Sequence, residues 1–192
     1  NDVLIPANVR MFFSDQTYRT VPVDLAELHK SSRVINIGST DISKTRVEMV
    51  FEETFGYGMA INPLDHTGRA VRKSDENAVH DGMIVTCPCD PELGYIYQRY
   101  IDTTAPDGRH KDLRIPVFDG FIPCVLTRYK DENDHFNITT DVDYHKTEDA
   151  LSQDEIERVR TFVKRMGLDY AEIDALRDSE DGKLYIVDAN NT

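Results

Sequence analysis

The chain has 192 residues, with 22 Lys and Arg against 35 Asp and Glu, so its formal net charge is −13. Such an acidic composition argues against nucleic acid or an anionic membrane surface as the main partner. Hydrophobic residues make up 40% and charged residues 30%, as is typical of a soluble globular protein, and no apolar run approaches the roughly 20 residues that span a bilayer. We expect a soluble, cytoplasmic protein, and a homo-oligomer is compatible with the sequence.

The first third of the chain predicts short strands and two helices. Three apolar segments are typical of strands, at residues 3–5, 9–13 and 33–38. A short helix begins at Pro22 and runs to Lys30. Asp41 is a suitable N-cap for a second helix over about residues 42–55, whose apolar stripe ends at Gly56.

The middle of the chain predicts two groups of strands. Short segments between turn signals predict a small antiparallel sheet, at residues 57–62, 69–74 and 83–86. Three longer strand candidates follow, at residues 95–101, 112–118 and 121–129. Asp119-Gly120 joins the last two and is a strong signal for a two-residue hairpin. Residues 130–151 are polar and predict no element.

The last third predicts a helix followed by a hairpin. Ser152 and Glu155 form a capping box, and apolar residues then recur at helical spacing until Gly167. Two strands follow, over residues 170–177 and 183–188. The order of elements predicts a mixed α/β (α+β) fold without internal repeats.

The three cysteines are Cys87, Cys89 and Cys124. Cys87 and Cys89 are too close together, and too constrained by the proline between them, to predict a disulfide or a CxxC redox motif. The spacing of the three does not suit a zinc site either. The sequence therefore predicts no thiol chemistry.

Acidic residues are concentrated in the last third. Residues 131–192 contain 17 Asp and Glu and 7 Lys and Arg, a balance of −10, whereas residues 1–130 have a balance of −3. One interpretation is an ordinary solvated face. The other is that some of these carboxylates surround a divalent cation.

Three oxygen-bearing side chains favour the cation. In a hairpin of the last two strands, Asp174 can pair with Asp188, and Asn190 points to the same face as Asp188 because the two are two residues apart. Mg²⁺ prefers such oxygens and completes its shell with water and phosphate oxygens. The alternative is a hairpin whose acids are merely exposed, with Asn190-Asn191 as a turn.

Two lysines are candidates for a phosphate site. Lys44 lies in the first turn of the helix over residues 42–55, and Lys73 lies in a strand consistent with burial on one side. Facing a divalent metal, they would suit a nucleoside triphosphate, whose charge must be neutralised before a nucleophile can approach the γ-phosphate. The polar loop over residues 74–82 could cover phosphates through its N–H groups. The alternative is that Lys73 is an exposed strand residue.

From about Asp41 to its end, the chain resembles the ATP-grasp superfamily of ATP-dependent ligases. Lys44 and Lys73 are similar to the two phosphate-contacting lysines of that family, and Tyr97-Gln98-Arg99-Tyr100-Ile101 is similar to its adenine-binding hinge strand. The resemblance implies an ATP site that contains Lys44, Lys73, Gln98, Tyr100 and Ile101.

Further motifs extend the resemblance. Asp112-Leu113-Arg114-Ile115, followed by Arg128, looks like the D-x-R…R pattern of the branch that includes glutathione synthetases and ribosomal-protein glutamate ligases, and Asn137 is similar to an asparagine after the second arginine. The end of the chain resembles the metal-binding D…E-x-N of the family, with Asp188 where glutamate is usual. This implies a metal site of Asp174, Asp188 and Asn190.

The resemblance implies a two-lobed clamp with mixed and antiparallel sheets. A small lobe over about residues 45–95 would close on a large lobe over about residues 96–192, with ATP and Mg²⁺, or Mn²⁺, between them. Residues 1–40 would be the remnant of, or the connection from, an N-terminal α/β domain. We therefore expect the chain to be a piece of a longer protein. The loop over residues 74–82 departs from the family because it has few glycines.

The implied activity joins a carboxylate to an amine or similar nucleophile through an acylphosphate. The substrates would be small molecules or peptides. Arg114, Arg128 and Arg177 would steady the carboxylate or the acylphosphate, since a planar guanidinium matches both. Two alternatives stay open: a kinase built on the same clamp, and a non-catalytic nucleotide-binding module.

Overall fold

The computed structural model describes residues 9–14, 16–131 and 139–191, so the predicted strand at residues 3–5 and Asn137 lie outside the described residues. In chain order the described elements are β1 (Arg10–Met11), α1 (Val23–His29), β2 (Val34–Ile35), α2 (Lys44–Phe55), β3 (Gly68–Ser74), β4 (Met83–Cys87), β5 (Tyr95–Arg99), β6 (His110–Phe118), β7 (Val125–Lys130), β8 (Thr139–His145), α3 (Thr147–Ala150), α4 (Gln153–Arg165), β9 (Tyr170–Arg177) and β10 (Leu184–Asn190).

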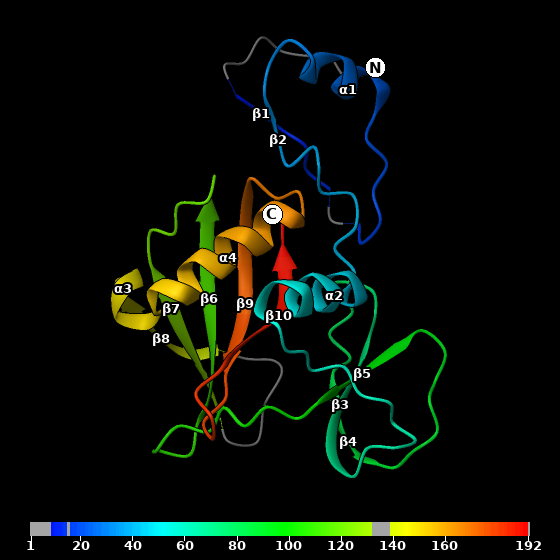
Figure 1. Cartoon of the computed structure of the whole chain (residues 1–192), viewed down its shortest axis with the longest axis vertical. Coiled ribbons are helices and arrows are strands. Elements are labelled where there is room, and N and C mark those ends of the chain that lie inside the picture. Colours follow the sequence, from blue (N-terminus) through cyan, green and yellow to red (C-terminus); the bar gives the residue numbers. More distant parts are fainter. Residues whose placement is uncertain (1–8, 15, 132–138, 192) are drawn as a thin grey trace.

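Two antiparallel sheets dominate the fold (Figure 1). The larger sheet has five strands in the order β10-β9-β6-β7-β8, and the smaller has three in the order β4-β3-β5. All neighbours within these two sheets are antiparallel. The predicted mixed α/β fold with antiparallel pairs is confirmed.

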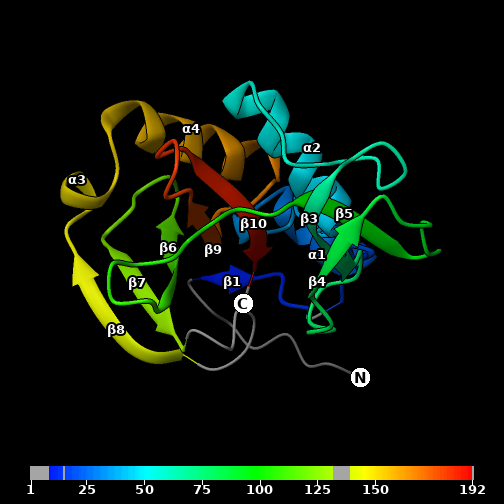
Figure 2. The ribbon, with the colours of Figure 1, turned by 90° about the horizontal axis from the view of Figure 1, so that it is seen from below.

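The main hydrophobic core lies between the five-stranded sheet and two helices. α2 packs against β10 and α4, and Figure 2 shows both helices on the same side of the sheet. Alternate strand residues such as Ile115 and Ile173 point toward the helices and are fully buried, as is Phe51 of α2. Because strand side chains alternate between faces, the remaining residues of these strands point away from the helices.

Both long helices form where their capping signals predict. Ser152 and Glu155 make a complete capping box at the start of α4. α2 ends at Gly56 in the left-handed conformation, as predicted, but its N-cap is Ser43, whose hydroxyl accepts from the backbone N–H of Arg46 at 3.2 Å. Asp41 instead accepts from the N–H of Ser43, and this local bond moves the helix start two residues along the chain.

The smaller sheet differs from the prediction in one strand. Residues 57–62 form no strand, and only Ala60 makes an isolated bridge, to Gln98. The N–H groups of Met59 and Ala60 donate to the Glu48 carboxylate and are therefore lost to a strand ladder. The third strand is β5, which pairs with β3.

β8 occupies a segment for which the sequence predicts no element. Its side chains are exposed from Thr139 to Tyr144, so the strand lacks the apolar alternation that marks a half-buried strand. The predicted Asp119-Gly120 hairpin is present: Phe118 and Phe121 exchange two backbone hydrogen bonds of 2.8 Å around a turn with positive φ at both central residues.

The segment that contains β1 and β2 is hydrogen-bonded to the start of β9 through Asn36. β1 and β2 form a two-stranded parallel pair. The fully buried Asn36 accepts from the N–H groups of Asp169 and Tyr170, both at 2.8 Å, and its amide donates to the carbonyl of Tyr170 at 2.9 Å. None of the helices in the described part of the chain is both long and apolar enough to cross a membrane.

Candidate functional site

Four neighbouring strands of the larger sheet carry polar residues at positions two apart, on the face away from α2 and α4. These pairs are Asp112 and Arg114 on β6, Arg128 and Lys130 on β7, Glu172 and Asp174 on β9, and Asp188 and Asn190 on β10. Residues two apart on a strand share a face. The polar residues therefore form a charged floor on this face of the sheet.

The strand register aligns these residues across the sheet. Arg114 of β6 lies opposite Asp174 of β9, and Asp174 lies opposite Asp188 of β10. The pairing of Asp174 with Asp188 that the sequence predicts is therefore present. Asp112 lies opposite Arg128 in the same way.

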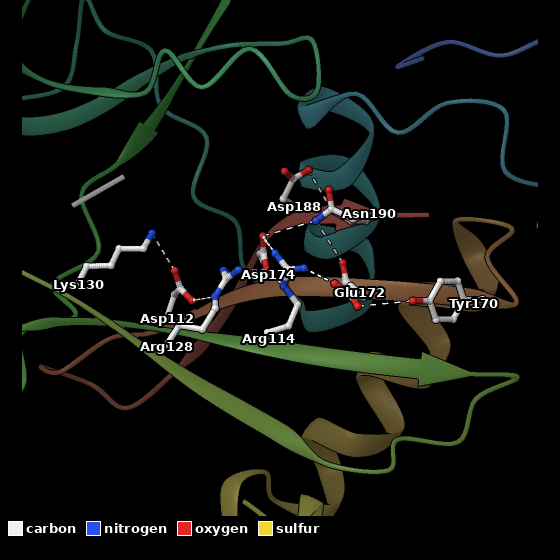
Figure 3. A network of polar contacts seen from close by, with 10 residues as sticks. Asp112, Arg114, Arg128, Lys130, Tyr170, Glu172, Asp174, Asp188 and Asn190 are labelled. Atoms are coloured by element: carbon white, nitrogen blue, oxygen red, sulfur yellow. Dashed lines mark hydrogen bonds and ion pairs between the residues drawn. The ribbon is translucent and has the colours of Figure 1, made fainter. Parts of the chain in front are cut away.

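The charged side chains bind one another in a continuous network (Figure 3). The Asp174 carboxylate accepts hydrogen bonds from Arg114 Nε at 2.6 Å and Nη2 at 3.2 Å. It also accepts one from Arg128 Nη2 at 2.9 Å. Arg128 also donates to Asp112 at 2.5 Å, and Lys130 forms an ion pair with Asp112 at 2.9 Å. Arg114 further pairs with Glu172, and the Asn190 amide reaches Asp174 Oδ2 at 3.5 Å. Asp174 is the centre of this network.

Burial makes Asp174 an unusual carboxyl group. Desolvation raises its pKa above the ordinary value of 3.8, and the negative charges of Asp188 and Asp112 act in the same direction. The two arginines oppose this shift and do not cancel it. A further cation close to Asp174 and Asp188 would therefore be electrostatically favourable.

A cavity of about 580 Å³ lies over this floor. It is lined by nearly all of the residues that the sequence singles out: Lys44, Lys73, Gln98, Tyr100, Ile101, Arg114, Arg128, Asp174, Asp188 and Asn190. Its volume lies in the range of pockets that hold small ligands and cofactors. The cavity thus joins positions from β3 and β5 of the smaller sheet to positions from the larger one.

Arg177 is the predicted site residue that does not line this cavity. Its guanidinium donates to Glu155 and to the carbonyl of Gly182, both at 2.7 Å, and to the carbonyl of Ala150 at 3.1 Å. It lies three positions after Asp174, an odd spacing that turns its side chain to the other face of β9. Arg177 joins the start of α4 to the β9–β10 turn.

The two predicted lysines both face the cavity. Lys73 Nζ donates to the carbonyl of Val187 at 3.2 Å, beside Asp188. Burial lowers the pKa of Lys73 to about 8, against the attraction of Asp188. Lys44 Nζ donates to the carbonyl of Glu76 at 2.6 Å.

The loop after β3 is attached to the start of α2. The Asp75 carboxylate accepts from the N–H of Thr45 at 2.7 Å and from the Tyr18 hydroxyl at 3.2 Å, and its carbonyl accepts from the N–H of Lys44 at 3.0 Å. His80 of the same loop lines the cavity. An acidic side chain thus already occupies the N-terminus of the helix, a position that favours negative charge.

Strand β5 is held in place by a residue that the sequence prediction does not include. Glu48 of α2 is 7% exposed and accepts from the N–H groups of Met59 and Ala60, at 2.8 and 3.0 Å, and from Gln98 Nε2 at 2.5 Å. Gln98 is itself buried and lines the cavity. Glu48 thereby holds both β5 and the segment beside it.

Two other residues of the site, Lys130 and Glu172, are absent from the sequence prediction, although the sequence contains a signal for them. Each lies two positions from a predicted site residue on the same strand, and so does Asp112, which the sequence places in the D-x-R motif without a role of its own. Applying period two to each strand would have found all three as site residues. Glu48 could have been found because it is an acid on the helix face of Phe51 and Phe55.

Hard oxygen donors are present for a divalent cation. The predicted set of Asp174, Asp188 and Asn190 consists of two carboxylates and an amide, and no cluster of three or more His, Cys, Asp or Glu side chains suited to a metal occurs within the described ranges. The donor chemistry suits Mg²⁺. Both Asp174 oxygens already accept from guanidinium groups, and desolvation nevertheless keeps the pKa of this carboxyl group raised. The residues therefore fit the cation that the sequence predicts.

Comparison with protein families and curated proteins assigns no family. No protein-family model matches the chain. A probable dipeptidyl-aminopeptidase B from Ajellomyces capsulatus (strain G186AR) is 36% identical over 75 residues, which cover 36% of this chain and 8% of that protein. So short a share of that protein carries no functional assignment.

Comparison with solved structures identifies the fold. The ATP-grasp ligase PsnB, complexed with its minimal precursor, superposes with a TM-score of 0.62 at 16% identity and covers 87% of this chain and 59% of PsnB. D-cycloserine synthetase DcsG superposes with a TM-score of 0.54 at 12% identity, and the match covers 86% of this chain and 68% of DcsG. The VanG D-Ala:D-Ser ligase from Enterococcus faecalis superposes with a TM-score of 0.56 at 11% identity, and the match covers 78% of this chain and 52% of VanG. The chain therefore has the fold of ATP-grasp ligases and spans a little over half the length of PsnB.

Proposed function

We propose that this chain is the ATP-binding part of a Mg²⁺-dependent ligase, which activates a carboxylate as an acylphosphate and transfers it to an amine. One observation carries the proposal. All of the site residues predicted from the sequence except Arg177 line a single cavity in a chain with the ATP-grasp fold. Arg177 is therefore left out of the proposed site.

The lysines and the charged floor would divide the work of holding the nucleotide. Lys44 and Lys73 would neutralise the triphosphate from the side of the smaller sheet. Asp174, Asp188 and Asn190 would hold Mg²⁺, which supplies charge neutralisation to the phosphates when bound. A PsnB structure contains Mg and ADP, which supports the same pairing of ligands here.

The arginines would hold the groups that react. Arg114 and Arg128 both donate to Asp174, and each has a second carboxylate partner on the same floor. A cation bound to Asp174 would neutralise part of its negative charge. The guanidinium groups of Arg114 and Arg128 could then bind the substrate carboxylate or the acylphosphate. Bidentate recognition of these planar or tetrahedral anions is a common role of arginine.

The substrates of this proposed ligase are a carboxylate and an amine, each on a small molecule or a peptide. Support for a peptide comes from PsnB, which was also solved with the precursor peptide PsnA2. The Asp112, Arg114 and Arg128 pattern supports placing the activity near the glutathione synthetase and ribosomal-protein glutamate ligase branch. The lobes proposed from the sequence would close on these substrates from the two sheets.

The proposal is tested first by binding, which does not require the rest of a longer enzyme. Isothermal titration of the full chain should show ATP binding that is strengthened by Mg²⁺. Asp188→Ala should remove the Mg²⁺-dependent part, whereas Asp149→Ala, at an exposed carboxylate of α3, should leave it unchanged. Equal Mg²⁺ dependence in Asp188→Ala and the unchanged chain would contradict the metal assignment.

The products then separate the ligase from the alternatives. A ligase releases ADP and phosphate only when both a carboxylate and an amine are supplied. A stable phosphorylated product would instead indicate a kinase. ATP binding without turnover by the longer protein would indicate a nucleotide-binding module.

A further inference from the structure

Cys87 and Cys89 bring two thiols together at one end of the smaller sheet. Cys87 is the last residue of β4, and Cys89 lies in the segment that leads to β5. Their Sγ atoms are 3.8 Å apart, which is contact distance for two sulfur atoms. Neither residue lines the cavity. The pair is therefore separate from the proposed nucleotide site and does not depend on the proposed function.

The two thiols differ in their access to solvent. Cys87 is 3% exposed, whereas Cys89 is only half-buried. The backbone N–H of Cys89 donates to the carbonyl of Pro63 at 3.0 Å, which holds this residue beside the end of β4. Burial raises the pKa of the Cys87 thiol, and the Cys89 sulfur adds to the shift. An incoming reagent will therefore meet Cys89 first.

We propose that Cys87 and Cys89 form a redox-active dithiol that closes to an intramolecular disulfide by exchange with a small disulfide such as oxidised glutathione. The Cys89 thiolate attacks the small disulfide, forms a mixed disulfide and releases one thiolate. Cys87 then loses its proton and attacks the Cys89 sulfur, which displaces the second thiolate. The protein gives up two electrons and two protons, and one small disulfide becomes two thiols.

The geometry favours the second step. Closure from 3.8 Å to a bond of about 2.05 Å needs the two Sγ atoms to approach each other by about 1.7 Å. Because both thiols belong to one chain segment, this step is intramolecular and competes well against a second small thiol. The sequence spacing alone predicts no thiol chemistry, and the sulfur contact is the observation that leads to the opposite proposal.

The test equilibrates the full chain with mixtures of reduced and oxidised glutathione, followed by acid quenching, intact mass measurement and peptide mapping. The Cys124→Ser variant serves as the background, because it leaves the pair as the only cysteines. We expect a product lighter by two hydrogen atoms, in which one peptide contains both Cys87 and Cys89 joined. The unchanged chain should give the same joined peptide.

Single variants in the same background separate closure from ordinary thiol reactivity. Cys87→Ser removes the resolving thiol, so Cys89 should accumulate a stable glutathione adduct. Cys89→Ser should leave Cys87 largely unmodified, and circular dichroism checks that each variant is folded. The proposal is overturned if the parent with both thiols accumulates the adduct at Cys89 without closing. It is also overturned if the parent stays reduced under conditions that modify Cys89 in Cys87→Ser.

Discussion

The two faces of the five-stranded sheet carry different kinds of side chains on the same strands. On the face beneath α2 and α4, Ile115, Ile173 and Ala175 are fully buried among apolar neighbours. On the opposite face, Arg114 and Asp174 satisfy each other through hydrogen bonds next to an open cavity. One face is built to exclude water, and the other carries charged side chains beside a cavity. Substitutions on the helix-covered face should alter the free energy of unfolding, and substitutions on the cavity face should alter nucleotide affinity.

The largest expected effect is on the helix-covered face. Phe51→Ala removes a fully buried ring that packs against Phe55, Tyr57 and Tyr185, with centroid distances of 4.7, 5.4 and 5.9 Å. We expect the free energy of unfolding to fall by about 4 kcal/mol, measured by urea denaturation. ATP affinity of the folded fraction should stay unchanged. A loss of affinity with little loss of stability would break the distinction between the faces.

Glu48 should give an intermediate effect, because it lies on α2 but contacts Gln98 of β5, which lines the cavity. Glu48→Ala leaves the buried N–H groups of Met59 and Ala60 and the Gln98 amide without their acceptor. We expect a loss of about 3 kcal/mol in the free energy of unfolding together with weaker ATP binding. Glu52→Ala, at an exposed carboxylate on the same helix, is the matched control and should change neither.

On the cavity side, Lys73→Ala should alter binding more than folding. Loss of its ammonium group should weaken ATP binding by about tenfold to a hundredfold, or roughly 1.4–2.8 kcal/mol. AMP binding should weaken much less. Titration of both nucleotides measures this difference. Lys164→Ala, at an exposed lysine of α4, is the control. Equal weakening of ATP and AMP would remove Lys73 from the phosphates.

The same lysine predicts a pH dependence. With a pKa of about 8 in the folded protein and an ordinary value of 10.5 in the unfolded chain, Lys73 takes up a proton on unfolding between these pH values. Its contribution therefore makes the free energy of unfolding rise with pH in this window. ATP affinity should fall over the same range, because the neutral amine does not attract phosphate. Lys73→Arg keeps its charge and should flatten this profile, so an equally steep decline in Lys73→Arg would exclude Lys73 as the cause.

The smallest effect is expected at the start of α4, where Ser152 does not line the cavity. Ser152→Ala removes the hydroxyl that accepts from the N–H of Glu155 at the start of α4. We expect a loss of about 1 kcal/mol in the free energy of unfolding and no change in ATP affinity. Thermal denaturation and nucleotide titration measure the two quantities. A change in affinity would show that α4 acts on the cavity through the sheet.

Elements with a local signal were predicted well from the sequence. The capping box places α4 correctly, and the strands that become β9 and β10 have the predicted register of Asp174 with Asp188. β8 could not be predicted, because an edge strand with exposed side chains has no hydrophobic period. Residues 57–62 were wrongly predicted as a strand because the contact that prevents it comes from Glu48 on another element.

The candidate site was predicted in the same uneven way. Asn190, which shares a strand face with Asp188, was found, whereas Glu172, which shares one with Asp174, was missed. Arg177 was included although its odd spacing from Asp174 turns it to the other face. The pairing of Asp112 with Arg128 and Lys130 depends on strand neighbours that no local pattern specifies. The convergence of Lys44 and Lys73 over the larger sheet likewise depends on how the two sheets pack.

Asp75 at the start of α2 has a consequence for how the protein senses its ionic environment. Its carboxylate and carbonyl already take the N–H groups of Thr45 and Lys44, so the helix end has its own built-in counterion. In the proposed function, phosphate recognition would then fall to the ammonium groups of Lys44 and Lys73 instead of fixed backbone dipoles. Interactions between charges are screened by dissolved ions, and more strongly where the charges are exposed. If the proposed function holds, nucleotide affinity should therefore decrease as potassium chloride is added.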